Sequence, residues 1–251
     1  MAADPHPPAD AASDPRLVRR LVGDRSRSLF SRLTSAPVLG IALVIVTLLA
    51  AGPFQGLDLF LAKRWLYRID PSLIPFAQNV LDRVASQIVC VPILAAVAIV
   101  LARRRRSWRP LLVALLAEAA FVIGIGAMKV LTARGVTYER DPDLLDAGLF
   151  EMGTKGISFP SGHASEAMLI YGAAVYLISQ YSSASRRLVL TLRWAVVLIC
   201  VNSVTVSFLL GWHWVTDLVG GLLAGGLALR LLVDWDMRAH RRRAGPTEPG
   251  R

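Results

Sequence analysis

Residues 211–233 read GWHWVTDLVGGLLAGGLALRLLV, and this stretch contains the clearest structural signal in the chain. From Trp214 onward it is apolar apart from Thr216, Asp217 and Arg230. A helix needs about 20 mostly apolar residues to cross the hydrocarbon core of a bilayer. The stretch therefore predicts a membrane-spanning helix with His213 just before its first turn.

Further apolar blocks of similar length precede this one, in a chain that is 54% apolar. An open sheet cannot satisfy its backbone polar groups in lipid, and blocks of this length are too long for the strands of a barrel. The sequence therefore predicts an all-α fold, a six-transmembrane helical bundle. Its spans are expected at about 37–54, 87–102, 110–131, 163–180, 189–210 and 214–233.

Arginines predict the orientation of this bundle, because segments rich in Lys and Arg stay in the cytoplasm. If every block spans, the basic segments share one side, so both termini are expected to be cytoplasmic. The connections 55–86 and 132–162 and the turn at 211–214 then lie outside. The basic segments are the N-terminal arm, Arg103 to Arg106 with Arg109, Arg186 with Arg187, and Arg238 with Arg241 to Arg243.

The chain divides into a membrane domain and two polar ends. Residues 1–36 form a basic cytoplasmic arm, expected to be disordered because it has little apolar surface to bury. Residues 37–235 are the six-helix membrane domain, and residues 236–251 a basic cytoplasmic tail. The arm has the wrong order and length for a cleavable signal peptide.

The net charge of +10 raises the question of nucleic-acid binding. The arginines flank the apolar blocks, where they meet lipid head groups, so no nucleic acid is expected. Cys90 and Cys200 lie inside apolar blocks and are read as small hydrophobic residues. The basic residues are mostly arginine, which is typical of GC-rich bacterial genomes, and a bacterial plasma membrane is the expected location.

The two outer connections carry weaker signals. Leu57, Leu61 and Trp65 have helical spacing, which fits a helix lying in the membrane interface or an ordinary solvated loop. The segment 132–160 is long for a compact bundle and acidic, which suggests a lid or a head-group selector.

His213 and Asp217 are four residues apart, which places both side chains on one face of a helix. The carboxylate can then hold one imidazole nitrogen and leave the other free as a nucleophile or base. Ionisable residues at membrane depth are costly, so the pair is a candidate site. A structural histidine paired with a carboxylate is the alternative.

Pro160-Ser161-Gly162-His163 opens the fourth span. A helix N-terminus offers free N–H groups to an anion, and glycine allows a ligand close to the backbone. The alternative is ordinary helix initiation with Ser161 as the cap. Lys129, at the end of span three, adds a cation on the same side, and phosphoryl transfer needs a nucleophile, an acid and cations together.

Lys129, the run PSGH at 160–163 and the pattern Gly211-x-His213-x-x-x-Asp217, in this order on consecutive helices, resemble the type 2 phosphatidic acid phosphatase superfamily, which includes vanadium haloperoxidases. The resemblance covers roughly residues 110–233. It implies that His213 is a nucleophile forming a phosphohistidine and that Asp217 orients it. It also implies that His163 is the acid, that Lys129, Ser161 and the Gly162 N–H bind phosphate, and that no metal or cofactor takes part.

Both arginines of the superfamily's motifs are missing. Val136 and Ser207 stand where they are expected. Arginine is the usual bidentate clamp for phosphate oxygens. One hypothesis is that Arg134 or Arg140 replaces the clamp; the alternative is that they pair with Glu139, Asp141 or Asp143.

The predicted function is a membrane lipid phosphatase that acts at the outer leaflet on a prenyl diphosphate or a glycerolipid phosphate. One alternative is a head-group phosphotransferase that uses the same histidine. Another is a non-catalytic lipid-binding or transport protein. The expected partners are the lipid substrate and the bilayer, with no obligate protein partner.

Overall fold

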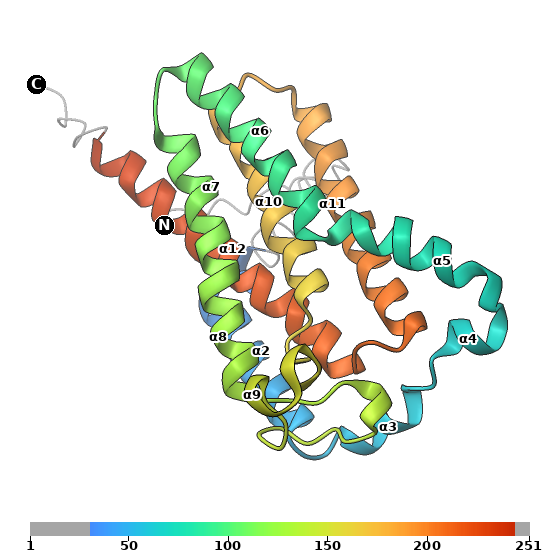
Figure 1. Cartoon of the computed structure of the whole chain (residues 1–251). Helices are drawn as coiled ribbons and strands as arrows, with labels where there is room; N and C mark the ends of the chain where they lie inside the picture. Colours follow the sequence, from blue (N-terminus) through green and yellow to red (C-terminus); the bar gives the residue numbers. More distant parts are fainter. Residues whose placement is uncertain (1–30, 244–251) are drawn as a thin grey trace, which may run out of the picture.

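The computed structural model describes residues 31–243, and this part of the chain is helical with no strand (Figure 1). The all-α prediction is confirmed. The disorder predicted for the N-terminal arm falls almost entirely on residues 1–30, outside the described part.

The long helices follow the predicted apolar blocks. The third block is one continuous helix whose middle is a π-helical segment, η5 (Ala120–Ile125), between α7 and α8. The six blocks correspond to α2 (Ala36–Ala50), α6 (Gln87–Arg105), α7 (Arg109–Ala119) with α8 (Gly126–Thr132), α10 (Gly162–Tyr181), α11 (Arg186–Leu210) and α12 (Val215–Arg243).

Several of these helices are long and apolar enough to cross a membrane. Four stretches of the described part qualify by length and composition: Pro71–Arg105, Arg109–Glu139, Arg186–Leu210 and Val215–His240. The bent pair Ala36–Ala50 and Gln55–Ile69 can supply a fifth span. The protein is thus an integral membrane protein, while six crossings and cytoplasmic termini stay predictions.

Helix α10 is missing from that count because it is the inner helix of the bundle. It packs against α6, α7, α11 and α12, and Figure 1 shows it among them. Its first two turns carry His163, Ser165 and Glu166, of which the last two are buried. A helix shielded from lipid by its neighbours does not need a uniformly apolar surface.

Helices α10 and α12 approach each other closely through glycines. A Cβ on Gly221 would lie 2.6 Å from the Ser161 carbonyl oxygen, and one on Gly225 would lie 2.6 Å from that of Ser165. Small residues allow such contact between membrane helices. The Ser161 N–H donates to the Asp217 carbonyl at 2.9 Å, so the start of α10 lies directly on the first turn of α12.

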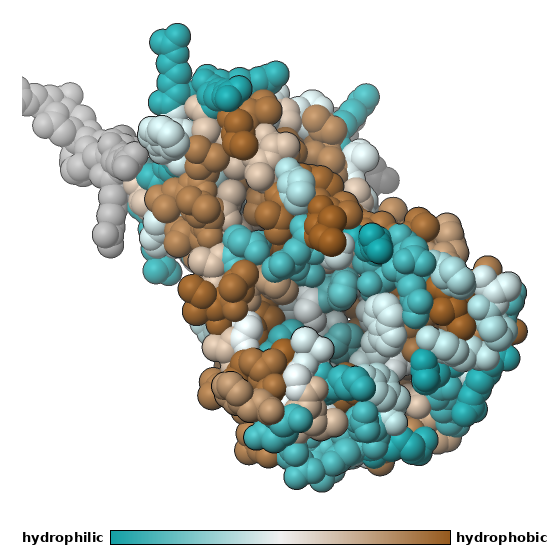
Figure 2. Space-filling model, viewed as in Figure 1, coloured by the Kyte–Doolittle hydropathy of each residue, from teal (hydrophilic) through white to brown (hydrophobic). Residues whose placement is uncertain are grey.

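The basic segments of the described residues gather at one end of the bundle. The α6–α7 turn, the α10–α11 turn and the end of α12 lie together at one end, opposite α3 and α9 (Figure 1). The basic segments of the described part therefore share an end, as predicted. Figure 2 shows hydrophilic residues at both ends and largely hydrophobic helices between them.

The boundary predicted between membrane domain and tail, at residue 236, falls inside a helix. Helix α12 continues to Arg243. Asp236 is fully buried and accepts hydrogen bonds from Arg109 at 2.9 Å, Tyr176 at 2.7 Å and Tyr181 at 2.8 Å. These bonds fix the end of the last helix to α7 and α10.

The connection after α2 is helical, so its reading as an ordinary loop is wrong. It contains α3 (Gln55–Leu61) and α4 (Trp65–Ile69), which are separated at Arg64, a residue in the left-handed region with φ 47°. Short helical segments then lead into α6. Together with α6 they form the stretch Pro71–Arg105, which is longer than the span predicted at 87–102. The short segments are η2 (Pro71–Leu73), α5 (Ile74–Phe76), η3 (Ala77–Leu81) and η4 (Asp82–Ala85).

The second outer connection contains only short helices: η6 (Thr137–Glu139), α9 (Leu149–Met152) and η7 (Gly153–Gly156). Hydrogen bonds hold it against the bundle. Ser158 N–H donates to the Arg134 carbonyl at 2.8 Å, and the Trp214 indole donates to the Gly135 carbonyl at 2.8 Å. Its role as a lid or selector stays a prediction.

Replacing glycine with alanine inside a helix usually stabilises the helix, but at the α10–α12 contact it should destabilise the protein. Gly225→Ala should lower the free energy of unfolding in detergent by about 1–3 kcal/mol, because the new methyl group meets backbone that cannot move aside. Gly40→Ala in α2, where nothing lies within 4 Å of the new Cβ, should be neutral or stabilising. Equal stability of the two variants would contradict the close packing.

Candidate active site

The predicted His213–Asp217 pair is formed. Gly211, with φ +68°, ends α11, and His213 lies in the short turn before α12. Its Nδ1 is 3.3 Å from Asp217 Oδ2, which also accepts from the Trp214 N–H at 3.1 Å. With Nδ1 held in this way, the free imidazole nitrogen is Nε2.

The surroundings of His213 favour its neutral form. Burial lowers the pKa of His213. The hydrogen bond to Asp217 and its charge oppose this, while the positive charges of Lys129 and His163 lower the pKa further. A neutral imidazole has the lone pair that a nucleophile needs. The start of α10 lies beside this pair, since the Ser161 N–H donates to the Asp217 carbonyl at 2.9 Å.

Lys129 and the start of α10 form one wall of the site. Lys129 Nζ donates to the Ile157 carbonyl at 2.9 Å, and its Cε lies 3.7 Å from where a Gly162 Cβ would be. The lysine thus lies against the N-terminus of α10. A side chain at position 162 would be in van der Waals contact with Lys129.

Ser161 does not serve as a side-chain cap, so the helix-initiation alternative for this residue is wrong. Its side chain accepts no bond from the first turn of α10. It is fully buried, and its Oγ has no hydrogen-bond partner in the described part of the chain. A buried hydroxyl without a partner is costly, and a ligand oxygen in the site would satisfy it.

His163 has a partner that the sequence analysis missed. Its Nε2 lies 3.2 Å from Asp82 Oδ2. Asp82 belongs to η4, far from α10 in sequence, and no spacing pattern connects the two residues. The site therefore contains two histidine–carboxylate pairs.

Arg134 does not occupy the place of a phosphate clamp, which corrects one of our hypotheses. It is fully buried. Its Nη1 donates to Asp217 Oδ1 at 2.6 Å and to Thr216 Oγ1 at 2.7 Å. Its Nη2 donates to Asp58 Oδ2 at 2.8 Å, and its Nε donates to the Pro142 carbonyl at 2.8 Å. Arg134 lies behind Asp217 and fixes the carboxylate that holds the nucleophile.

Asp58 is a second residue that the sequence analysis missed. It is the buried residue of α3, and its Oδ1 accepts from the Thr216 N–H at 3.2 Å. Its carboxylate thus binds both Arg134 and the first turn of α12. No feature of the sequence marks it, because its partners come from two distant segments.

Arg140 also fails to take the predicted place. It is exposed and left-handed, with φ 59°. Neither it nor Arg134 forms an ion pair with Glu139, Asp141 or Asp143 within residues 31–243, so the alternative pairing is wrong as well. At one position of the missing arginines, Ser207 is fully buried with its Oγ unpartnered.

Two comparisons with known proteins bear on this geometry. The family model of the PAP2 superfamily matches residues 134–241. This part of the chain is a PAP2-superfamily domain. The matched region contains the PSGH run and the His213–Asp217 pair, and it begins just after Lys129.

The PAP2 domain lies within a fold that is also found in a solved structure. The chain is similar to the crystal structure described as the first transmembrane PAP2 type phosphatidylglycerolphosphate phosphatase from Bacillus subtilis, with a TM-score of 0.68 and 20% sequence identity. The match covers 81% of this chain and 96% of the other. At this identity the likeness shows a common fold.

Among residues 31–243, no group of at least three His, Cys, Asp or Glu side chains is placed to hold a metal ion.

The position of Arg134 predicts a large effect on stability. Arg134→Gln leaves Asp58 and Asp217 buried without their counter-charge, which should lower the free energy of unfolding by about 3–5 kcal/mol. The exposed Arg140→Gln should change it by less than about 0.5 kcal/mol. Unfolding in detergent measures both. Unchanged stability with reduced substrate affinity in Arg134→Gln would restore the clamp hypothesis.

Proposed function

We propose that the protein is a membrane lipid phosphatase that releases phosphate from a glycerolipid phosphate or a prenyl diphosphate. The observation that carries the proposal is the His213–Asp217 pair, facing Lys129 and His163 at one end of an apolar bundle. The PAP2 domain supports it, as does the Bacillus subtilis neighbour, a phosphatidylglycerolphosphate phosphatase.

The reaction consists of two displacements at phosphorus. Nε2 of neutral His213 attacks, the bond to the lipid oxygen breaks, and His163 donates its proton to that oxygen. The product is the lipid alcohol, or the lipid monophosphate when the substrate is a diphosphate, together with a phosphohistidine. His163 then takes a proton from water, whose oxygen attacks phosphorus, and inorganic phosphate leaves as His213 is restored.

Charge stabilisation comes from a small set of groups. Lys129, the Ser161 hydroxyl and the Gly162 N–H surround the place where phosphate oxygens would lie. Arg134 supplies no charge directly, because its donors are bound to protein groups. The transferred group thus faces one lysine in place of an arginine clamp.

The arginine bias supports an outward-facing site. The basic segments of the described part lie at the end of the bundle opposite α3 and α9 (Figure 1), whereas His163 and His213 lie where α10 and α12 begin. With basic segments in the cytoplasm, the substrate lies in the outer leaflet of a bacterial plasma membrane. The acidic segment 132–160 then covers the water side of the site.

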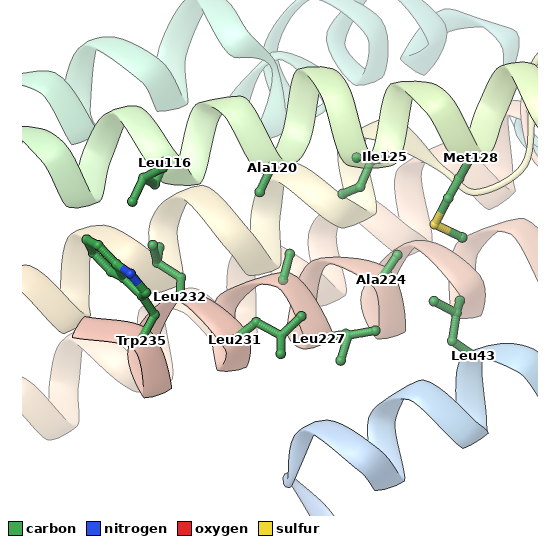
Figure 3. A pocket seen from close by; sticks show the side chains of 12 residues that line it. Leu43, Leu116, Ala120, Ile125, Met128, Ala224, Leu227, Leu231, Leu232 and Trp235 are labelled. Atoms are coloured by element: carbon green, nitrogen blue, oxygen red, sulfur yellow. The ribbon is translucent and has the colours of Figure 1, made fainter. Parts of the chain in front are cut away.

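An apolar groove provides room for the hydrocarbon chain of the substrate. It has a volume of about 450 Å³ and lies between α2, the α7–α8 helix and α12, with Leu43, Leu116 and Trp235 among its lining residues (Figure 3). Met128, at one end, directly precedes Lys129. From Ala224 to Trp235 the groove follows α12 for roughly 16 Å, about half the thickness of the hydrocarbon core.

The primary experiment measures phosphate release by the purified protein in detergent, from phosphatidyl phosphates and prenyl diphosphates. His213→Ala should abolish release, His163→Ala should reduce it about 10²–10⁴-fold, and the exposed Lys155→Ala should not change it. Because the pKa of His213 is lowered, release should persist at pH values below the ordinary histidine pKa before falling with acid.

The outcomes of this experiment separate the candidate functions. A new phosphodiester, formed from an added acceptor without phosphate release, would identify a head-group phosphotransferase. Substrate binding without turnover of any phosphorylated lipid would identify a binding or transport protein.

The groove predicts a chain-length effect. Gly124 lines the groove, and nothing lies within 4 Å of a Cβ there, so Gly124→Leu should fill it without disturbing its neighbours. We expect kcat/KM to fall about tenfold for a long-chain substrate and to stay unchanged for a short-chain phosphate ester. Gly126→Leu, which has equal space but does not line the groove, is the control. Equal losses on both substrates would contradict this binding mode.

A further inference from the structure

The segment that carries Asp82 is fixed in place on both sides of this residue. Before it, the Leu81 carbonyl accepts a hydrogen bond from Asn202 Nδ2 of α11 at 2.8 Å. After it, the Val84 carbonyl accepts from the Tyr171 hydroxyl of α10. These bonds join the start of the second span to two other helices, so the Asp82 backbone has a defined position relative to His163.

The Asp82 carboxylate is directed at His163. Its Oδ2 lies 3.2 Å from Nε2 of the imidazole, and its side chain is only 10% exposed. Its Oδ1 is buried without a hydrogen-bond partner in the described part of the chain. His163 is the only basic group paired with it among residues 31–243.

The two histidine–carboxylate pairs differ in charge. Asp217 is bound by Arg134 at 2.6 Å as well as by His213, so two basic groups share one carboxylate. Asp82 faces His163 without such a competing cation. A carboxylate whose only basic partner is an imidazole favours the positively charged form of that imidazole. A carboxylate that is also paired with an arginine favours it less. In enzymes, such differences in environment often give the acid and the base of one active site different pKa values.

We propose that Asp82 is a positioning residue that orients His163 through Nε2, keeps it protonated, and leaves Nδ1 to donate the proton to the leaving oxygen. The acid role of His163 rests on the function proposed above. The pairing uses opposite nitrogens in the two histidines, since His213 is held through Nδ1 and His163 through Nε2.

Other charged groups also face His163. Glu166 lies three residues further along α10 and is buried, and its Oε1 has no hydrogen-bond partner in the described residues. When ionised, its carboxylate adds to the effect of Asp82. Lys129 of α8 opposes protonation. His213, from the turn before α12, is in surroundings that favour its neutral form, because burial lowers its pKa. Asp82 is the one group of this set in direct contact with the imidazole.

The first test is the pH dependence of phosphate release in Asp82→Asn, which preserves the shape of the side chain. The basic limb, where His163 loses its proton, should move to lower pH by about one unit or more. The acidic limb, set by His213, should stay in place. Asp82→Glu should restore the basic limb in part.

Asp70→Asn is the matched control, because Asp70 lies in the same connection, is at most partly buried, and binds Ser72 through its side chain rather than a histidine. Its profile should be unchanged. A uniform loss of activity in Asp82→Asn, with both limbs unmoved, would reduce Asp82 to a structural role and overturn the proposal.

A second test does not depend on turnover. The chain has four histidines, so ¹³C-histidine labelling in detergent gives few signals, and His163→Gln assigns one of them. In Asp82→Asn the His163 signal should titrate about one pH unit lower, while the His213 signal should keep its midpoint. An unmoved His163 signal would overturn the proposal even if the protein is not a phosphatase.

Discussion

The buried charge of Arg134 is the interaction on which the site end of the bundle depends. It binds Asp58 of α3 and Asp217 of α12 while lying itself in the segment after α8. Burying three charges is expensive, and such groups persist where each has partners of good geometry. Here the result is a carboxylate that is fixed in position and partly balanced by the arginine, with its second oxygen directed at His213.

The glycine contact between α10 and α12 provides the second constraint. Because the glycines allow the two helices to pack closely, the start of α10 contacts the first turn of α12, where the Ser161 N–H donates to the Asp217 carbonyl. Two histidines from different helices therefore meet at one site. Asp217 is paired with Arg134 as well as with its histidine, whereas Asp82 is paired with His163 alone among residues 31–243, so the two similar pairs differ in charge. One fold can thus supply a nucleophile and an acid at the same pH.

The features that could be predicted from the sequence are those set by residues close together in the chain. The helices follow from apolar blocks of bilayer length, and His213 with Asp217 follows from four-residue spacing within one helix. Arg134, Asp58 and Asp82 could not be assigned in this way. Arg134 is separated from its two acidic partners by 76 and 83 residues, and only the packing of helices brings them together. The burial of Asp236 could not be predicted either, because its partners Arg109 and Tyr176 are far from it in sequence.

The central claim is that His213, held by Asp217 and Arg134, is the group that becomes phosphorylated. The most direct measurement is rapid quenching of the protein with a radiolabelled lipid phosphate under alkaline conditions, followed by peptide mapping. The account predicts acid-labile, base-stable label on the peptide that contains His213, and none in His213→Ala. Label on another residue, or turnover with no labelled protein at any time, would contradict it.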